Sequence, residues 1–123
     1  MKIRLIFEEG PEILVNLKDT PCAQALYESA PFEARVNLWG EEIYFITPVV
    51  FALDETAKEL VERGEVGYWP EGKALCLFFG PTPISNPGEI RPASPVNIVG
   101  QIISPLDDLR KISEGTKVRV EKI

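Results

Sequence analysis

Four large amphipathic rings are the residues of this chain best suited to recognise a ligand. Trp39, Tyr44, Tyr68 and Trp69 all stand close to expected turns, and such rings offer a broad apolar surface with one polar tip. They either form the wall of a binding site or pack the end of a barrel, and the sequence supports the two interpretations equally. A ligand held by such a wall would be mostly apolar, with one polar end.

Three charged residues, Arg35, Glu41 and Glu42, lie close in sequence to Trp39 and Tyr44. Neighbouring residues on a strand point to opposite faces of a sheet, so the two carboxylates do not form a catalytic pair. Glu42 either reaches a cleft or is a solvated charge at the exit of a turn. Arg35 either donates a hydrogen bond to a ligand or, as the sequence favours, is a solvated or salt-bridged strand residue.

An uninterrupted apolar run, Ala74–Phe79, follows the turn Pro70–Lys73 and ends at a Gly-Pro-Thr-Pro segment. Six apolar residues bounded by glycine and proline predict a strand that is buried on both faces. Phe78 and Phe79 could line a pocket, although at least one of them is expected to be plain core.

A proline-rich loop, Asn86–Pro95, comes next and is expected to cover one face of that strand. Its prolines make it stiff, so it would lose little entropy on closing over a ligand. We therefore expect a pocket bounded by this loop and by Tyr44, Tyr68, Phe79 and Pro81, with Arg35 or Glu42 as its only charge. The predicted ligand-binding residues are Arg35, Glu42, Tyr44, Tyr68, Trp69, Phe79, Pro81 and Thr82. Thr82, like Ser94 and Asn97, could equally cap a turn.

Composition narrows the classes of function. The net charge is −6 and no Lys/Arg-rich run occurs, so neither nucleic acid nor an anionic membrane is an expected partner. The chain has no histidine, which removes Ser-His, Cys-His and most zinc chemistries, and Cys22 and Cys76 lie far apart. We expect no cofactor, no metal and no catalytic residue. The N-terminus does not resemble a signal peptide, so a cytoplasmic location is expected.

Local patterns predict seven or eight short strands and two short helices. The helices are expected at Pro21–Ala30, capped by Thr20, and at Pro105–Ser113, capped by Ser104 with Asp107 completing a capping box. The strands are expected at 2–7, 12–17, 34–39, 42–46, 96–103 and 116–123, in addition to the central hairpin 66–79. Asp54–Arg63 is ambiguous between helix and strand, and one loose helical turn is favoured. Short strands joined by hairpin-length turns predict one domain, residues 1–123, that forms a closed, mainly antiparallel all-β barrel.

This order of elements resembles the cyclophilin fold. Three segments resemble a small prokaryotic family of cyclophilin-like proteins of unassigned function: Val36–Phe45, Gly67–Pro70 and Gly72–Gly80. The C-terminal segment, with Gly100, Asp107 or Asp108, and Ile112, resembles the end of a cyclophilin. The resemblance covers nearly the whole chain and implies a barrel of cyclophilin type.

The resemblance to true cyclophilins stops at their catalytic residues. Those enzymes carry a Phe-His-Arg strand whose arginine polarises the prolyl amide, and a Gln-Phe-Phe strand. Here Phe45 stands near the place of the arginine and Leu77 stands where the glutamine would be. An aromatic pocket that binds both isomers equally accelerates nothing.

Three hypotheses of function follow. The first is a non-catalytic module that binds a small molecule or an extended peptide in a groove on the side of the barrel. The second is a weak peptidyl-prolyl isomerase. The third is an interaction protein whose apolar groove forms a homo-oligomer.

Overall fold

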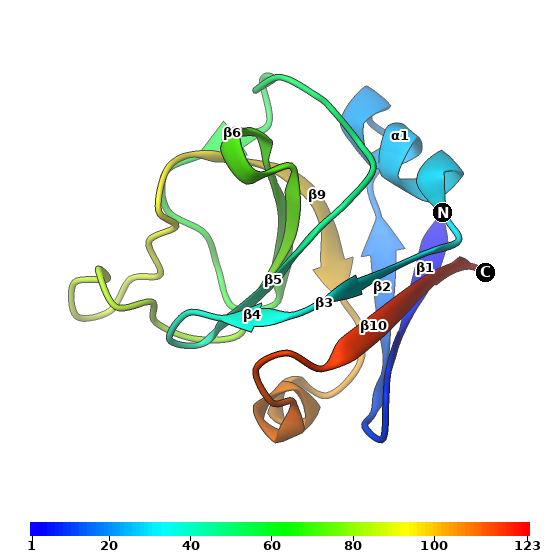
Figure 1. Cartoon of the computed structure of the whole chain (residues 1–123). Helices are drawn as coiled ribbons and strands as arrows, with labels where there is room; N and C mark the ends of the chain where they lie inside the picture. The colour runs from blue at the N-terminus through cyan, green and yellow to red at the C-terminus, as the bar shows by residue number, and fades with distance from the viewer.

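A computed structural model describes all 123 residues. Its ten strands form one antiparallel sheet that curls into a nearly closed barrel (Figure 1). The strands are β1 (Lys2–Phe7), β2 (Glu12–Leu17), β3 (Phe32–Arg35), β4 (Asn37–Leu38), β5 (Glu42–Ile46), β6 (Ala57–Lys58), β7 (Glu65–Trp69), β8 (Ala74–Phe78), β9 (Val96–Ile102) and β10 (Lys117–Lys122). The strand order is β3-β10-β1-β2-β9-β7-β8-β5-β4, and β6 pairs with β9. The predicted barrel of cyclophilin type is confirmed.

The barrel is closed by one stretch of chain that joins its two edge strands. β3 pairs with β10, whereas β4, only one residue further along, pairs with β5. Val36 stands at the switch, and its N–H and C=O bond to Thr116 O at 2.9 Å and Gly115 N at 2.9 Å. The expected single strand 34–39 is therefore two short strands, because its residues must pair first with one edge and then with the other.

The helix α1 (Pro21–Ser29) covers one end of the barrel. Its start is the predicted one: Thr20 Oγ1 accepts a hydrogen bond from Ala23 N at 3.2 Å, and Pro21 occupies the first turn. Its apolar side buries Cys22, Ala23 and Leu26. No helix is long and apolar enough to cross a membrane.

The second expected helix is a 3₁₀ helix, η2 (Leu106–Lys111), and its predicted capping box is wrong. The hydroxyl of Ser104 instead accepts a hydrogen bond from Leu14 N at 2.8 Å, which ties this segment to β2. The Ser104 oxygen that could have capped the helix therefore accepts a tertiary hydrogen bond instead. A second 3₁₀ turn, η1 (Pro70–Gly72), joins β7 to β8.

The favoured helical turn within Asp54–Arg63 is also wrong. Asp54 Oδ1 accepts hydrogen bonds from the backbone N of Thr56 at 2.8 Å and from its hydroxyl at 2.6 Å, which makes a turn rather than a helix cap. The next two residues pair with β9 as β6. Asn97, buried on β9, accepts from Asp54 N at 2.8 Å and holds this segment against the sheet.

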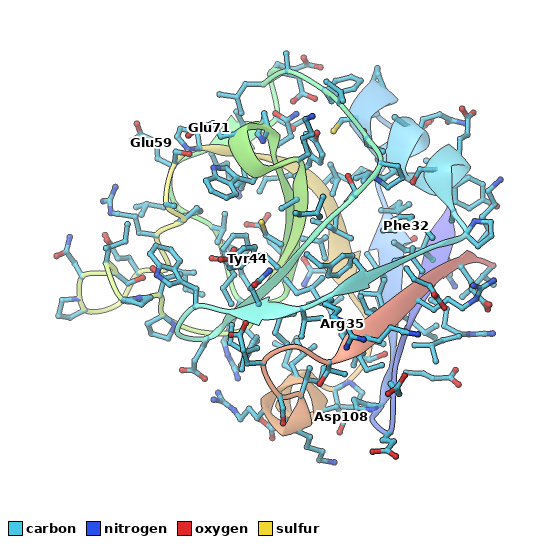
Figure 2. The ribbon with its side chains drawn as sticks, in the orientation of Figure 1. Phe32, Arg35, Tyr44, Glu59, Glu71 and Asp108 are labelled. Atoms are coloured by element: carbon cyan, nitrogen blue, oxygen red, sulfur yellow. The ribbon has the colours of Figure 1, made fainter.

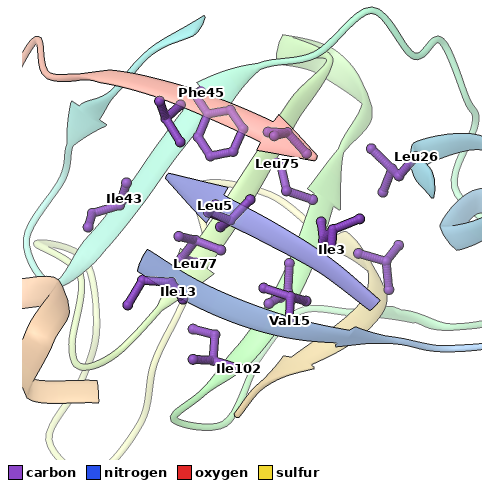
Figure 3. Packing of buried hydrophobic residues seen from close by; sticks show 14 of the residues in the cluster. Ile3, Leu5, Ile13, Val15, Leu26, Ile43, Phe45, Leu75, Leu77 and Ile102 are labelled. Atoms are coloured by element: carbon purple, nitrogen blue, oxygen red, sulfur yellow. The ribbon is translucent and has the colours of Figure 1, made fainter. Parts of the chain in front are cut away.

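Two separate apolar clusters lie on the two faces of β8. The larger one fills the barrel and includes Phe45, Leu75 and Leu77 (Figure 3). The smaller one lies outside the barrel, and its buried members are Val61, Ala74, Cys76, Phe78, Val96 and Ile98. Every residue of β8 is buried, as the apolar run predicted, because each face of the strand meets a different cluster.

Candidate functional site

A cavity of about 200 Å³ lies on the outer face of the barrel, next to the smaller cluster. Its lining combines five strand residues, one residue of a turn and two residues of the loop 86–95. These are Trp39, Glu42, Tyr44, Trp69, Cys76, Pro92, Ala93 and Val96. Six of the eight are hydrophobic, so the site is an apolar pocket with a single carboxylate.

Strand alternation explains which side chains reach this cavity. On β5, Glu42 and Tyr44 share the outer face, whereas Ile43 and Phe45 point into the barrel and are fully buried. Cys76 on β8 stands directly opposite Tyr44, so both side chains lie on the same face. The pairing of β5 with β8 therefore builds the floor.

A tight turn brings Trp39 beside Glu42. Their backbones exchange hydrogen bonds, from Trp39 N to Glu42 O at 2.9 Å and from Glu42 N to Trp39 O at 3.2 Å. Directly opposed residues of this kind project to the same face. Gly40 makes the turn feasible, since its φ is +60° and a Cβ there would stand 2.9 Å from Pro81 O.

The third ring, Trp69, is held in place from both sides. Its indole Nε1 donates to Ser94 Oγ at 2.6 Å, and Ser94 Oγ donates to Glu71 Oε1 at 2.9 Å. Gly72 lies under the ring, where a Cβ would approach within 2.5 Å of it. Tyr44 meets Trp69 nearly at right angles, with 6.4 Å between the ring centroids. Tyr44 and Glu71 are labelled in Figure 2.

The roof is the loop 86–95, which polar contacts fasten to its neighbours. The Thr82 hydroxyl donates to Arg91 O, and Arg91 N donates to Ser85 Oγ at 2.9 Å. Ile90 forms an isolated β-bridge with Val61. These contacts position Pro92 and Ala93 over the cavity.

Glu42 is the unusual member of the site. The residue is 5% exposed, and its Oε1 is buried without a hydrogen-bond partner. Burial raises the pKa of this carboxyl to about 7, and the neighbouring Cys76 thiol only partly counters that effect. A carboxyl group in this state can accept a hydrogen bond or, when protonated, donate one.

Cys76 is the other titratable group on the floor. Burial, and then the nearby charge of Glu42, raise the pKa of its thiol well above the ordinary value. A thiol with a raised pKa is a poor nucleophile, because only the thiolate reacts. Nowhere do three His, Cys, Asp or Glu side chains gather to hold a metal ion.

Of the eight residues predicted from the sequence, Glu42, Tyr44 and Trp69 line the cavity. Of the loop 86–95, Pro92 and Ala93 line it. Trp39, noted for its ring but left out of the predicted site, lines it as well, together with Cys76 and Val96. The alternation of β5 and β8 could have indicated Cys76, because it follows once the register of the two strands is known.

The other five predicted residues lie elsewhere, which corrects the expected pocket boundary. Tyr68 is fully buried inside the barrel, where its hydroxyl donates to Val49 O at 2.6 Å. Phe79 belongs to the interior cluster and carries the Arg110 guanidinium 5.5 Å above its ring. Both residues stand at alternating strand positions whose side chains point into the barrel. The sequence alone does not show which of the two alternating sets points inward, because that depends on the strand register.

Arg35, Pro81 and Thr82 also stand outside the cavity. The exposed guanidinium of Arg35 donates to Gly115 O at 3.0 Å, and Figure 2 shows it beside β10. Pro81 is exposed and borders a separate, open depression next to Arg110. Thr82 is buried, and its hydroxyl fastens the loop.

Comparison with known proteins agrees with this architecture. A hypothetical protein from Archaeoglobus fulgidus, known from a solution structure, is similar to this chain with a TM-score of 0.83 and 41% sequence identity. The match covers 100% of this chain and 95% of the archaeal one. No functionally curated protein matches the sequence. The sequence model of the family described as "Cyclophilin-like" matches residues 1–121, and this chain belongs to that cyclophilin-like family.

Proposed function

We propose that this protein is a non-catalytic binding module that holds a small organic molecule, or one side chain of an extended peptide, in the cavity beneath the loop 86–95. The observation that carries the proposal is Glu42 Oε1, a buried oxygen without a partner at an otherwise apolar cavity. Burying a polar group without a hydrogen bond costs free energy, so such groups usually have a partner in the functional state. A ligand would supply that partner.

The size of the cavity limits what can enter. Its volume of about 200 Å³ is below the roughly 300–1,000 Å³ of pockets that hold drug-sized molecules. A ligand would therefore be small, with an apolar body that fits between the three rings and one polar end at Glu42. The lining offers no nucleophile in an activated state, which favours binding over chemistry.

The two tryptophans provide a direct assay, because they are the only ones in the chain and both line the cavity. Their indole N–H groups give two resonances in a ¹H–¹⁵N NMR spectrum, and Trp39→Phe assigns them. We expect a library of small molecules with an apolar body and one polar end to contain members that shift both resonances at millimolar concentration.

A blocking variant and a matched control make this test specific. Ala93→Phe adds a ring at an exposed roof position and should abolish the shifts while the fold persists. Val50→Phe adds similar bulk at a residue that is 76% exposed and outside the cavity, and it should leave them unchanged. If no compound shifts the indole resonances, or if Ala93→Phe leaves the shifts intact, the cavity is not the binding site.

A further inference from the structure

We propose that the ligand of this cavity is an organic cation, an alkylammonium with at least one N–H, whose charged end binds Glu42 and whose apolar body lies among Trp39, Tyr44 and Trp69. This inference rests on the proposed function and names the chemical class of the ligand. It depends on three features of the site: the unpaired oxygen, the arrangement of the rings and the charge of the lining.

The unpaired oxygen calls for a hydrogen-bond donor. Glu42 lines the cavity, and its Oε1 is buried with no hydrogen-bond partner at bonding distance. The neighbouring Cys76 thiol lowers the pKa of the carboxyl group but leaves this oxygen unpaired. A charged N–H donor satisfies the oxygen and also neutralises the carboxylate, and charge-assisted hydrogen bonds are about twice as strong as neutral ones. A quaternary ammonium would supply the charge but not the donor, so an N–H is part of the proposal.

The rings suit a cation as well as an apolar body. Tyr44 and Trp69 meet at an interplanar angle of 84°. A group that sits in the corner between two perpendicular rings lies against the face of at least one of them. The face of an aromatic ring carries negative electrostatic potential and attracts a cation within about 6 Å of its centroid.

The charge of the lining excludes the opposite class of ligand. Neither lysine nor arginine lines the cavity, so a carboxylate or phosphate ligand would meet only Glu42 and electron-rich rings. The whole chain also carries a net charge of −6, which favours the approach of cations. A neutral alcohol can donate to Glu42 too, but it cannot compensate the charge of that group once ionised.

The decisive experiment compares an amine with its neutral counterpart in the same binding assay. The probes are cyclohexylmethylamine, which is protonated at pH 8 as lysine is, and cyclohexylmethanol, which has the same body with a hydroxyl in place of the ammonium. Smaller alkylamines and their alcohols extend the series downward in size. Binding is followed by the two tryptophan indole resonances.

Two variants with the same change of charge separate the site from its surroundings. Glu42→Gln keeps the shape of the side chain and removes the charge inside the cavity. Glu41→Gln makes the same change one residue away, where the carboxylate pairs with Arg110 outside the cavity. We expect the amine to bind wild type and Glu41→Gln equally, at least tenfold more tightly than the alcohol, and to lose roughly ten- to a hundredfold in affinity with Glu42→Gln.

The outcomes distinguish the two proposals. If neither amines nor alcohols shift the indole resonances, the cavity does not bind such ligands, and both the proposed function and this inference fail. If the alcohols bind as tightly as the amines, or if Glu42→Gln binds the amine as well as wild type does, the proposed function stands and the cationic ligand is refuted. Retained binding with Glu41→Gln and weakened binding with Glu42→Gln support the inference.

The pH dependence of the affinity for the amine is a further test, because a purely structural role of Glu42 would not make that affinity depend on the ionisation of its carboxyl group. An ammonium ligand needs the ionised carboxylate, so its affinity should fall about tenfold between pH 8 and pH 6. The other titratable groups that line the cavity with Glu42 are the phenol of Tyr44 and the thiol of Cys76, and burial keeps that thiol protonated over this range. Tighter binding at pH 6 would instead indicate a ligand that accepts a hydrogen bond from protonated Glu42, and would overturn the inference.

Discussion

The inner and outer faces of the strand pair β5 and β8 are built from alternating residues of the same two segments. They differ in whether a buried polar group is left without a hydrogen-bond partner. The inner face presents Ile43, Phe45, Leu75 and Leu77, all fully buried and packed in the main core. The outer face presents Glu42, Tyr44 and Cys76 to a cavity. One face is closed by apolar packing alone, whereas the other keeps a carboxylate oxygen without a partner.

The comparison shows how one pair of strands can contribute to both stability and recognition. The period of two along a strand assigns each residue to one face, so the outer face can carry a polar side chain while the inner face remains close-packed. Mutations on the two faces should therefore have effects of different kinds.

The largest effect should come from the inner face. Phe45→Ala removes a fully buried ring from the barrel interior and should cost about 3–5 kcal/mol in the free energy of unfolding. Tyr44→Ala, one residue earlier, removes a half-buried ring from the outer face and should cost clearly less. Urea denaturation of the two variants measures the difference, and equal losses would show that the outer face is as important for folding as the core.

The second effect concerns pH and Glu42. Burial raises its pKa from the ordinary value of 4.5 to about 7 in the folded protein, so folding favours the protonated form. The stability associated with this group is complete below pH 4.5 and is lost as the pH rises towards 7, by about 3 kcal/mol in total.

Glu42→Gln cannot ionise and should escape that loss. Its free energy of unfolding relative to wild type should therefore increase by about 3 kcal/mol between pH 4 and pH 8, as measured by chemical denaturation at several pH values. Glu41→Gln serves as the control, because its carboxylate pairs with Arg110 outside the cavity and the same loss of charge there should not reproduce this trend. A difference between Glu42→Gln and wild type that does not change with pH would contradict the raised pKa.

A smaller effect is expected where the loop meets the aromatic wall. Ser94→Ala removes the hydroxyl that joins the Trp69 indole to Glu71 and should cost about 1 kcal/mol of stability. The Trp69 indole resonance should move, while that of Trp39 should stay near its wild-type position. If both resonances remain in place, the hydroxyl does not hold the ring.

No effect is expected in a prolyl isomerase assay. Arg35, the arginine considered from the sequence as a donor, bonds to Gly115 O instead of reaching the cavity. A protease-coupled assay on a proline-containing tetrapeptide should show only the uncatalysed rate. Acceleration that Arg35→Ala abolishes would restore isomerase activity as the function.

Light scattering tests the remaining alternative, a homo-oligomer formed through the groove. The cavity proposed here needs no second copy of the chain, so Ala93→Phe should block ligand binding without changing the molecular mass in solution. A stable oligomer that this variant dissociates would favour the interaction protein over the binding module.

Local patterns in the sequence sufficed for elements whose signals come from their own residues. The hairpin of β1 and β2 and the start of α1 at Thr20-Pro21 follow from alternation and from cap chemistry, and both were predicted with the observed bounds or within a residue. The burial of β8 on both faces followed from its uninterrupted apolar run. The predictions were wrong where polar groups bond to residues distant in the sequence. Ser104 bonds to Leu14 instead of capping a helix, and Asp54 bonds to Asn97 instead of starting a helical turn.

The sequence by itself determined the barrel, the aromatic residues near its turns and the stiff loop that follows β8. Only the tertiary structure decided which of those residues share a cavity. A shift of one residue in strand register exchanges the two faces, so Tyr68 and Phe79 turned inward while Trp69 and Tyr44 turned outward. The state of Glu42 was decided in the same way, because a carboxyl group loses its water and its partners only when strands and loop close around it.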